Sequence, residues 1–453
     1  MSQVELNREI FRQYDIRGIA EGDLSDEIVE RLGRAIGTYL KQNECQKITL
    51  GRDCRLSSER LRNALSYGLL DTGLDITDIG VCPTPLLYFS LHELESHGGI
   101  MITGSHNPAE YNGFKVALGK TTIYGDQIQQ IWEIASSGDF IQGKGTLEKT
   151  SLAQTYHQNL VKSLGTLPNS LRVVVDCGNG TASPIAPNLY RDLGCEVIEL
   201  YCTMDGHFPN HHPDPTVVDN LQDLIQTVRQ SSADLGIAFD GDADRIGAID
   251  NRGNIIWGDE LMILFSRSVL NVQPGATIIG EVKCSKNLYD DIEKRGGRGI
   301  MWKAGHSLIK AKMKEEGAAV AGEMSGHIFF ADRYFGYDDA IYAGARLLEL
   351  ISNCGQGISE MLADVPKTYK TPEIRMDCSD QRKFEIVSQA QDFFEKSHCT
   401  VTVDGVRVIF DDGWGLVRAS NTQPALVLRF EADSQERLDE IQALVENKLE
   451  DFM

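Results

Sequence analysis

A serine in a glycine-containing loop is the first group in the sequence that could do covalent chemistry. Ser105 stands in the segment TGSHNPAEYNGFK (residues 103–115), directly after the apolar run GIMI. Gly104 allows a sharp turn there, so the hydroxyl would lie at the end of a strand, where ligands collect in open α/β sheets. A serine hydroxyl needs a base or an electrophile to react. His106 and Lys115 are the candidates, and a simple serine turn is the alternative.

Three aspartates at alternate positions form a second candidate site. Asp240, Asp242 and Asp244 belong to the segment DGDADR, which follows the apolar run GIAF. Their oxygens suit Mg²⁺ or Ca²⁺ better than zinc. The spacing begins like an EF-hand, but Arg245 and Asn251 stand where that loop needs Gly and Glu. We therefore predict a metal loop of another kind, in which Arg245 pairs with the carboxylates or with a phosphate. A solvated acidic turn is the alternative.

The segment GEMSGH carries polar residues between two apolar runs. Glu323, Ser325 and His327 alternate, so an extended backbone would point all three side chains to one side. Buried polar groups need partners, and a carboxylate with a hydroxyl suits the hydroxyls of a sugar. The alternative is a bulge in which His327 is an ordinary core residue.

Further donors and bases occur near three other expected strand ends. The segment RASNT before the strand ALVLRFEA could cradle a phosphate, although a plain turn explains it equally well; its polar residues are Arg418, Ser420, Asn421 and Thr422. In KAGH, His306 precedes a helix expected to open at Ser307 and could transfer protons near neutral pH. Lys283 follows the apolar run IIGEV. Both could equally be surface features.

Alternating strands and helices must position these loops. Apolar runs alternate with amphipathic helical segments, which indicates an α/β architecture with largely parallel strands. The expected strands are Lys47–Leu50, Gly99–Ile102, Arg172–Asp176, Glu196–Leu200, Gly236–Asp240 and Thr277–Gly280.

Breaks in composition divide the chain into segments 1–150, 151–253, 254–366 and 367–453. The last segment is α+β: strands are expected at Val406–Phe410, Leu416–Ala419 and Leu426–Glu431, and a helix from Gln435 to Glu450.

The composition limits the class of partner. The chain has 453 residues and a net charge of −22, which argues against nucleic-acid or anionic-membrane binding over a broad surface. Its ten cysteines are scattered, as is typical of reduced thiols in a cytoplasmic protein. We recognise no signal peptide and no apolar stretch long enough to span a membrane.

Taken together and in order, the four loops resemble those of the α-D-phosphohexomutase superfamily over essentially the whole chain. TGSHNP with NGFK is similar to the phosphoserine loop, DGDADR to the metal loop, GEMSGH to the sugar loop and RASNT to the phosphate loop. The opening FRQYDIRG places Tyr14 and Arg17 near the site. GEMSGH, WKAGHSLIK and HHPDPT resemble the bacterial phosphomannomutase/phosphoglucomutase branch, whereas Ala243 stands where that branch often has Gly.

The resemblance implies a fold and a reaction. Four domains would surround a central cleft, the first three with related α/β cores and the fourth α+β, like the TATA-binding protein. Phosphorylated Ser105 would donate its phosphoryl group to a hexose phosphate, giving a 1,6-bisphosphosugar that turns over and returns its other phosphate. Glucose 1,6-bisphosphate would act as activator. One Mg²⁺ would be held by Asp240, Asp242, Asp244 and the group on Ser105.

The resemblance also implies roles for the remaining residues. Lys115, His106 and His306 are unranked candidates for proton transfer, and Arg245 would support the metal loop. The substrate would be bound by Tyr14, Arg17, Lys283, Gly305, Glu323, Ser325, His327, Arg418, Ser420, Asn421 and Thr422. A monomer is favoured. A phosphoglucosamine mutase is the main alternative, and a phosphatase or a non-catalytic sugar-phosphate binder are lesser ones.

Overall fold

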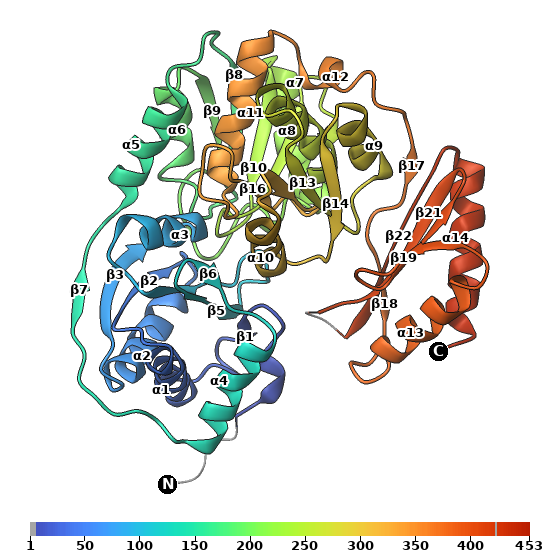
Figure 1. Cartoon of the computed structure of the whole chain (residues 1–453). Helices are drawn as coiled ribbons and strands as arrows, with labels where there is room; N and C mark the ends of the chain where they lie inside the picture. The colour runs from blue at the N-terminus through green and yellow to red at the C-terminus, as the bar shows by residue number, and fades with distance from the viewer. Residues whose placement is uncertain (1–5, 422–423) are drawn as a thin grey trace.

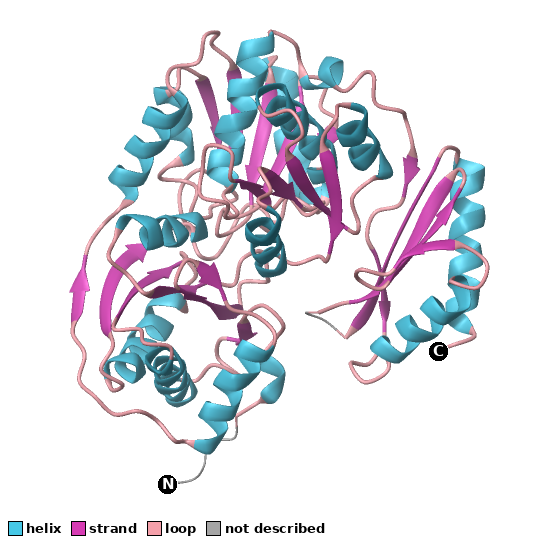
Figure 2. Ribbon diagram, in the orientation of Figure 1, coloured by secondary structure: helices cyan, strands magenta, loops and turns pink. Residues whose placement is uncertain are grey.

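Four β-sheets follow one another along the chain (Figure 1). The structure is a computed structural model that describes residues 6–421 and 424–453. The first three units are α/β and lie together, whereas the fourth, coloured orange to red, stands to one side. Helices cover the sheets of the first three units (Figure 2). The four-domain arrangement implied by the resemblance is confirmed.

The first sheet has the order β1-β5-β4-β2-β3-β7, with β6 beside β5. Its middle strands are parallel, and β5 runs antiparallel to both β4 and β1. The strands are β1 (Ile16–Ile19), β2 (Lys47–Arg52), β3 (Asp75–Val81), β4 (Gly98–Ile102), β5 (Tyr111–Leu118), β6 (Thr121–Thr122) and β7 (Leu147–Lys149). The helices are η1 (Arg8–Ile10), α1 (Asp26–Gln42), α2 (Ser58–Leu70), α3 (Thr84–Glu93) and α4 (Asp126–Ser137).

The second sheet has the order β12-β11-β10-β8-β9, with β8 parallel to β9 and β10 and with β11 antiparallel to β10. Its strands are β8 (Arg172–Asp176), β9 (Glu196–Leu200), β10 (Leu235–Phe239), β11 (Ile246–Asp250) and β12 (Ile255–Ile256). The helices are α5 (Ala153–Leu164), α6 (Ala186–Asp192), η2 (Val218–Leu221) and α7 (Gln222–Ser231). Strand β12 pairs with β11, so this sheet extends past residue 254.

The third sheet has the order β14-β13-β15-β16. Strand β13 is parallel to both of its neighbours, and β16 is antiparallel to β15. The strands are β13 (Thr277–Glu281), β14 (Arg298–Trp302), β15 (Val320–Gly322) and β16 (Ile328–Phe330). The helices are α8 (Gly258–Val272), α9 (Lys286–Lys294), α10 (His306–Glu316), α11 (Ala340–Cys354) and α12 (Ile358–Met361).

These three sheets share one arrangement at the position that matters for the site. In each, a parallel strand is followed by a loop and then by an antiparallel neighbour: β4 and β5, β10 and β11, β15 and β16. The loop of the first pair carries Ser105, that of the second carries the three aspartates, and that of the third carries GEMSGH. The candidate chemistry therefore occupies an equivalent hairpin in three related units.

The fourth sheet is antiparallel, with the order β17-β22-β21-β20-β19 and β18 beside β22. Its strands are β17 (Tyr369–Lys370), β18 (Ile374–Asp377), β19 (Cys399–Val401), β20 (Val406–Phe410), β21 (Gly413–Ala419) and β22 (Ala425–Ala432). Helices α13 (Lys383–Phe394) and α14 (Gln435–Glu450) pack on it and enclose a separate apolar core.

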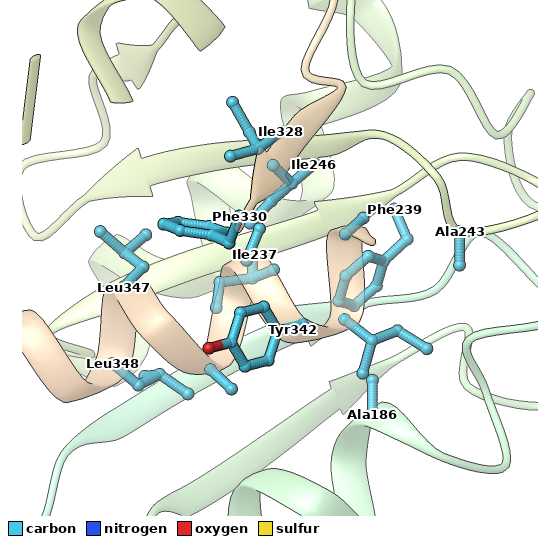
Figure 3. Packing of buried hydrophobic residues seen from close by; sticks show 14 of the residues in the cluster. Ala186, Ile237, Phe239, Ala243, Ile246, Ile328, Phe330, Tyr342, Leu347 and Leu348 are labelled. Carbon is cyan, nitrogen blue, oxygen red and sulfur yellow. The ribbon is translucent and has the colours of Figure 1, made fainter. Parts of the chain in front are cut away.

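The burial of the sheets explains why their strands could be predicted from the sequence. Strands β4 and β10 are buried along their whole length, and continuous apolar runs are typical of sheets covered on both faces. One core cluster joins the first three units: it contains Ile237 of β10, Phe330 of β16 and Tyr342 of α11 (Figure 3), together with Leu87 and Phe89 of α3. These three units therefore share a core.

Most expected elements are present. The six strands expected in the α/β part begin and end within two residues of β2, β4, β8, β9, β10 and β13. The expected terminal helix coincides with α14, and α10 begins one residue early, at His306. Among the described residues, no helix is long and apolar enough to cross a membrane.

The backbone of GEMSGH is not extended. It forms the tight turn of the β15–β16 hairpin, because Gly326 donates its N–H to the carbonyl of Glu323 and Glu323 donates its own to the carbonyl of His327. Gly326 has φ +94°, and an added Cβ would meet the Ile246 carbonyl oxygen at 2.3 Å. The polar side chains meet across the turn and not along one side of a strand.

Candidate active site

Ser105 is held in a conformation that residues other than glycine rarely adopt. Its φ is +49°, in the left-handed region, and its side chain is buried. The hydroxyl lies 2.9 Å from Asp240 Oδ2 and 3.1 Å from His106 Nδ1. Such backbone strain persists only where surrounding contacts impose it, and it is frequent at reactive groups. The serine of the first unit is thus aimed at the aspartate loop of the second.

Arg55 supplies much of that constraint, and the sequence analysis missed it. Its guanidinium donates to the carbonyl oxygens of Ser105, Asn107 and Pro108, at 2.8, 2.5 and 2.5 Å. A Cβ added to Gly104 would meet this guanidinium at 2.5 Å, which explains why glycine precedes the serine. The only sequence signal is an arginine shortly after the strand β2.

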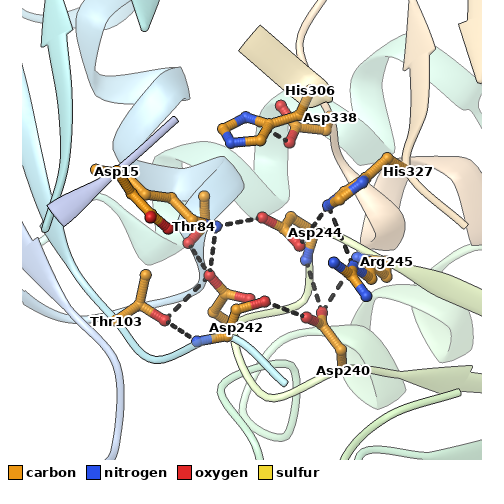
Figure 4. A network of polar contacts seen from close by, with 12 residues as sticks. Asp15, Thr84, Thr103, Asp240, Asp242, Asp244, Arg245, His306, His327 and Asp338 are labelled. Carbon is orange, nitrogen blue, oxygen red and sulfur yellow. Dashed lines mark hydrogen bonds and ion pairs between the residues drawn. The ribbon is translucent and has the colours of Figure 1, made fainter. Parts of the chain in front are cut away.

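The aspartates converge as the sequence predicted (Figure 4). Oxygen atoms of Asp240, Asp242 and Asp244 lie within 4.8 Å of one another, and all three side chains are buried. Asp240 Oδ1 accepts hydrogen bonds from the backbone N–H groups of Asp244 and Arg245, which close the loop. Lys115 Nζ lies 2.9 Å from Asp242 Oδ2 and 2.5 Å from Asp244 Oδ2.

These residues fit a divalent cation. Asp242 Oδ1 is buried and accepts no hydrogen bond from the part of the chain that the structure describes. Burial raises the pKa of Asp240 well above its usual range, and the charges of Asp242 and Asp244 raise it further. A cation bound among these oxygens would compensate the crowded negative charge, and an all-oxygen donor set suits Mg²⁺.

The sugar-loop residues meet the metal loop through His327. Its Nε2 lies 3.1 Å from Asp244 Oδ1, and its Nδ1 lies 2.7 Å from Glu323 Oε2. Burial acts to lower the pKa of His327, but the charge of Asp244 together with the hydrogen bonds to Asp244 and Glu323 outweighs it, and the pKa rises to about 9. Burial likewise acts to raise the pKa of Glu323, but the hydrogen bond and charge of His327 together with the charge of Lys283 lower it to about 2. His327 is therefore a buried cation and not a base.

This pairing predicts a pH dependence of stability. The folded-state pKa of His327 is about 9, above the ordinary 6.5, so its contribution is complete below pH 6.5 and is lost as the pH rises through 9. We expect the metal-free protein, kept in a chelator, to lose on the order of 2 kcal/mol of unfolding free energy across that window. His327→Gln should flatten the curve of denaturation midpoint against pH. A variant that keeps the wild-type slope would contradict the assignment.

Two other histidines remain neutral. Burial lowers the pKa of His106 and that of His306 well below the usual value, and nearby cationic side chains lower both further. His306 Nδ1 has no hydrogen-bond partner among the described residues and lies 3.6 Å from Asp338 Oδ2. Asp338 is fixed through its other oxygen by Lys310 Nζ at 2.9 Å. The sequence analysis missed Asp338 and Lys310, which lie outside the four motifs.

The fourth unit reaches the site through hydrogen bonds. Arg418 Nε donates to Asp404 Oδ2 at 3.0 Å, and the same oxygen accepts from the N–H of Ala304. Asn421 Nδ2 lies 2.6 Å from the hydroxyl of Tyr14, which donates to the Ala304 carbonyl at 2.7 Å. Arg418, through Asp404, and Asn421 are thus linked to the third and first units.

Two more predicted residues, Gly305 and Ser325, lie on the same network. The N–H of Gly305 donates to Glu323 Oε1 at 2.8 Å, and its φ of +127° and the nearby Tyr14 ring leave no room for a side chain. Ser325 Oγ lies 3.4 Å from His327 Nδ1.

The other predicted residues hold less central positions. Arg17 Nη1 donates to Asn107 Oδ1 at 2.8 Å, Lys283 Nζ pairs with Glu373, and the Ser420 carbonyl accepts from Lys383. Thr422 lies outside the described residues.

Hydrogen bonds thus connect loops of all four units: Ser105 to Asp240, Asp244 to His327, Glu323 to Gly305, and Tyr14 to Asn421. A strained serine beside a cluster of three buried aspartates that fits a divalent cation is typical of a phosphotransferase.

Comparison with known proteins identifies the family. The phosphoglucomutase/phosphomannomutase family models match in order: α/β/α domain I at residues 8–142, domain II at 154–253, domain III at 257–369 and the C-terminal domain at 373–448. The chain belongs to the phosphoglucomutase/phosphomannomutase family.

Relatives and solved structures agree with this family assignment. A phosphomannomutase/phosphoglucomutase of Pseudomonas putida is 48% identical over 442 residues, which cover 97% of this chain and 95% of that protein. A family protein of Burkholderia thailandensis, solved by crystallography, is 41% identical with a TM-score of 0.93, covering 99% and 98% of the two chains. The N-acetylphosphoglucosamine mutase of Aspergillus fumigatus, solved with GlcNAc-6P and magnesium, shares the fold (15% identity, TM-score 0.65, covering 97% and 95%).

Proposed function

We propose that this enzyme interconverts hexose 1-phosphates and hexose 6-phosphates of glucose and mannose through a phosphorylated Ser105 and a 1,6-bisphosphosugar. The observation that carries the proposal is the contact of the strained, buried Ser105 with Asp240 at the junction of three hairpin loops. Mg²⁺ bound by Asp240, Asp242 and Asp244 would offset negative charge on the transferring group. We further propose a single ion and activation by glucose 1,6-bisphosphate.

The protonation states of His306, His106 and Lys115 suggest different roles for these three candidates for proton transfer. In the transfer, a sugar hydroxyl oxygen bonds to phosphorus, the bond from phosphorus to Ser105 Oγ breaks, and the hydroxyl proton needs an acceptor. His306 is neutral and buried, and its Nδ1 has no partner among the described residues, which suits a base at the sugar. His106 lies next to Ser105 Oγ and suits proton exchange there. Charges of Asp242 and Asp244 outweigh burial and raise the pKa of Lys115 well above its usual range, which favours an electrostatic role.

Substrate binding would be divided between two loops. Glu323 and Ser325 would contact adjacent sugar hydroxyls, and Arg418 with Ser420, Asn421 and Thr422 would hold the phosphate that is not being transferred. Tyr14, Arg17, Lys283, Gly305 and His327 would complete the substrate site, and Arg245 would support the metal loop. We further propose that the enzyme is a monomer. Ten free cysteines support a cytoplasmic location.

The substrate assignment is tested by a coupled assay. Glucose 1-phosphate and mannose 1-phosphate are supplied separately with Mg²⁺ and a trace of glucose 1,6-bisphosphate. We expect comparable turnover of both sugars and no steady release of inorganic phosphate. Turnover of glucosamine phosphate alone would overturn the sugar assignment, and steady phosphate release would indicate a phosphatase.

Replacing Glu323 with glutamine should weaken catalysis without unfolding the loop. Glutamine can still accept the N–H of Gly305, but it removes the charge that would bind a sugar hydroxyl. We expect kcat/KM to fall about 100-fold, in line with the loss of a charged hydrogen bond to substrate. Glu315→Gln, on the exposed face of α10, is the control and should change nothing. Equal kinetics in the two variants would exclude Glu323 from the sugar site.

A further inference from the structure

Two of the ten cysteines touch one another behind the metal loop. Cys177 follows β8 and Cys202 follows the adjacent parallel strand β9, and their sulfur atoms lie 3.3 Å apart. Cys177 is fully buried, whereas Cys202 is partly exposed. The cysteine spacing along the chain gave no sign of this pair, because 25 residues separate the two positions. The proposed mutase reaction uses neither thiol.

We propose that Cys177 and Cys202 are a redox modification site, which closes to a disulfide under mild oxidation and loosens the metal loop. Disulfides in cytosolic proteins are typically transient and redox-sensing, and a thiol pair already in contact needs little rearrangement to form one.

The chemistry needs a peroxide as oxidant. The partly exposed Cys202 thiolate attacks one peroxide oxygen, the O–O bond breaks, and a sulfenic acid and hydroxide form. The Cys177 sulfur then attacks the sulfenic sulfur, the S–O bond breaks, and water leaves with the Cys177 proton. The two thiols lose two electrons, and one hydrogen peroxide becomes two waters. Burial raises the pKa of Cys177 well above its usual value, so Cys202 makes the first attack and the contact between the two sulfurs, not a reactive thiolate, brings Cys177 into the second step.

A short path connects the thiols with the catalytic loops. The carbonyl of Cys177 accepts the N–H of Gly180 at 2.7 Å, and the N–H and hydroxyl of Thr181 donate to the carbonyl of Gly241, at 3.0 and 3.2 Å. Gly241 stands between two of the metal-loop aspartates, and a Cβ on it would meet the Ser105 carbonyl oxygen at 2.6 Å. The segment from Cys177 to Thr181 therefore lies directly against the metal loop.

Oxidation would displace this segment. The sulfurs must approach from 3.3 Å to about 2.05 Å, a shift of roughly 1.2 Å shared by the two loops. In the sheet, β8 lies between β10, which leads to the metal loop, and β9, which leads to Cys202, so closing the disulfide would draw the Cys177–Thr181 segment away from Gly241 and strain the two hydrogen bonds of Thr181. We expect the aspartates to lose their alignment and the oxidised enzyme to need about fivefold more Mg²⁺ for half-maximal activity. This expectation rests on the proposed metal role of the aspartates.

The experiment treats the full-length enzyme with hydrogen peroxide in a Cys354→Ser/Cys399→Ser background, which removes the two exposed thiols. Free thiols are then alkylated, and peptides are mapped by mass spectrometry without reduction. We expect a Cys177–Cys202 cross-link, the shift in Mg²⁺ requirement, and recovery of both on adding dithiothreitol. The Cys202→Ser variant should show neither the cross-link nor the shift in Mg²⁺ requirement. Cys195 is a buried cysteine of the same unit, and the Cys195→Ala variant should show both.

The readouts separate two kinds of failure. Alkylation of both cysteines after peroxide treatment, with no cross-linked peptide, would overturn the proposal whatever the enzyme acts on. A cross-link with an unchanged Mg²⁺ requirement would overturn its coupling to the metal loop. If the activity of the reduced enzyme did not depend on Mg²⁺, the proposed mutase mechanism would be contradicted. The cross-link would still be tested, because the mass measurement is independent of activity.

Discussion

Replacing Ser105 with alanine is expected to lower mutase turnover by at least about a thousandfold, because alanine removes the hydroxyl that we propose carries the phosphoryl group. The side chain is buried and makes two hydrogen bonds, one to Asp240 and one to His106, so its loss should change stability little compared with activity. The measurement is the coupled assay on glucose 1-phosphate, together with a thermal denaturation midpoint for the same preparation.

Ser66→Ala is the matched control for this prediction. Ser66 is also a buried serine of the first unit, and its hydroxyl has no hydrogen-bond partner within residues 6–421 and 424–453. It should keep full activity. If Ser105→Ala retained a tenth or more of the wild-type rate at a normal denaturation midpoint, a phosphoserine mechanism would be excluded.

Asp240→Asn should separate activity from stability. Asparagine can still accept the N–H groups of Asp244 and Arg245, so the loop can close as before. Removing one of three crowded, buried carboxylates relieves repulsion in the metal-free protein, because burial and its two neighbours already raise the pKa of Asp240 far above normal. We therefore expect activity at saturating Mg²⁺ to fall at least about 100-fold, while the denaturation midpoint in a chelator stays level or rises.

Asp250→Asn should lower stability and leave activity almost unchanged. Asp250 closes the turn after β11 by accepting the N–H groups of Arg252 and Asn254, and hydrogen bonds, among them one from Ser359, outweigh burial and lower its pKa. Its replacement should reduce stability and leave the Mg²⁺-dependent activity per folded molecule near that of the wild type. A fall in stability for Asp240→Asn comparable with that for Asp250→Asn would show that the aspartate cluster is structural.

Local sequence was sufficient to find the loops and most strands. The runs before Ser105 and Asp240 form β4 and β10, strands covered on both faces, so their apolar residues are continuous and their ends are marked by polar ones. The sequence left the backbone of GEMSGH open, because alternating polar residues suit both a strand and a turn that contains glycine. The structure shows a turn, in which Gly326 has a positive φ.

Contacts between residues far apart in the chain could not be predicted from the sequence. Arg55 reaches the serine loop across some 50 residues, and Asp338 approaches His306 from a different loop, so neither belongs to a readable motif. Protonation states were equally hidden, because they depend on burial: His106 and His306 are neutral, whereas His327 between two carboxylates is charged. Ala243 shows a similar limit, since only the structure reveals its left-handed φ of +59°, a conformation that glycine adopts without strain.

The equivalent hairpins in the first three units bear on how enzymes of this architecture diverge. Under the proposed roles, the serine, the aspartate loop and the sugar-contacting turn each belong to a different unit, and His327 joins the turn to Asp244. Substrate range and phosphoryl transfer would then be encoded in separate short segments of the gene, except at His327. We therefore expect new specificities in such a lineage to arise first by exchange of residues of the β15–β16 turn other than His327.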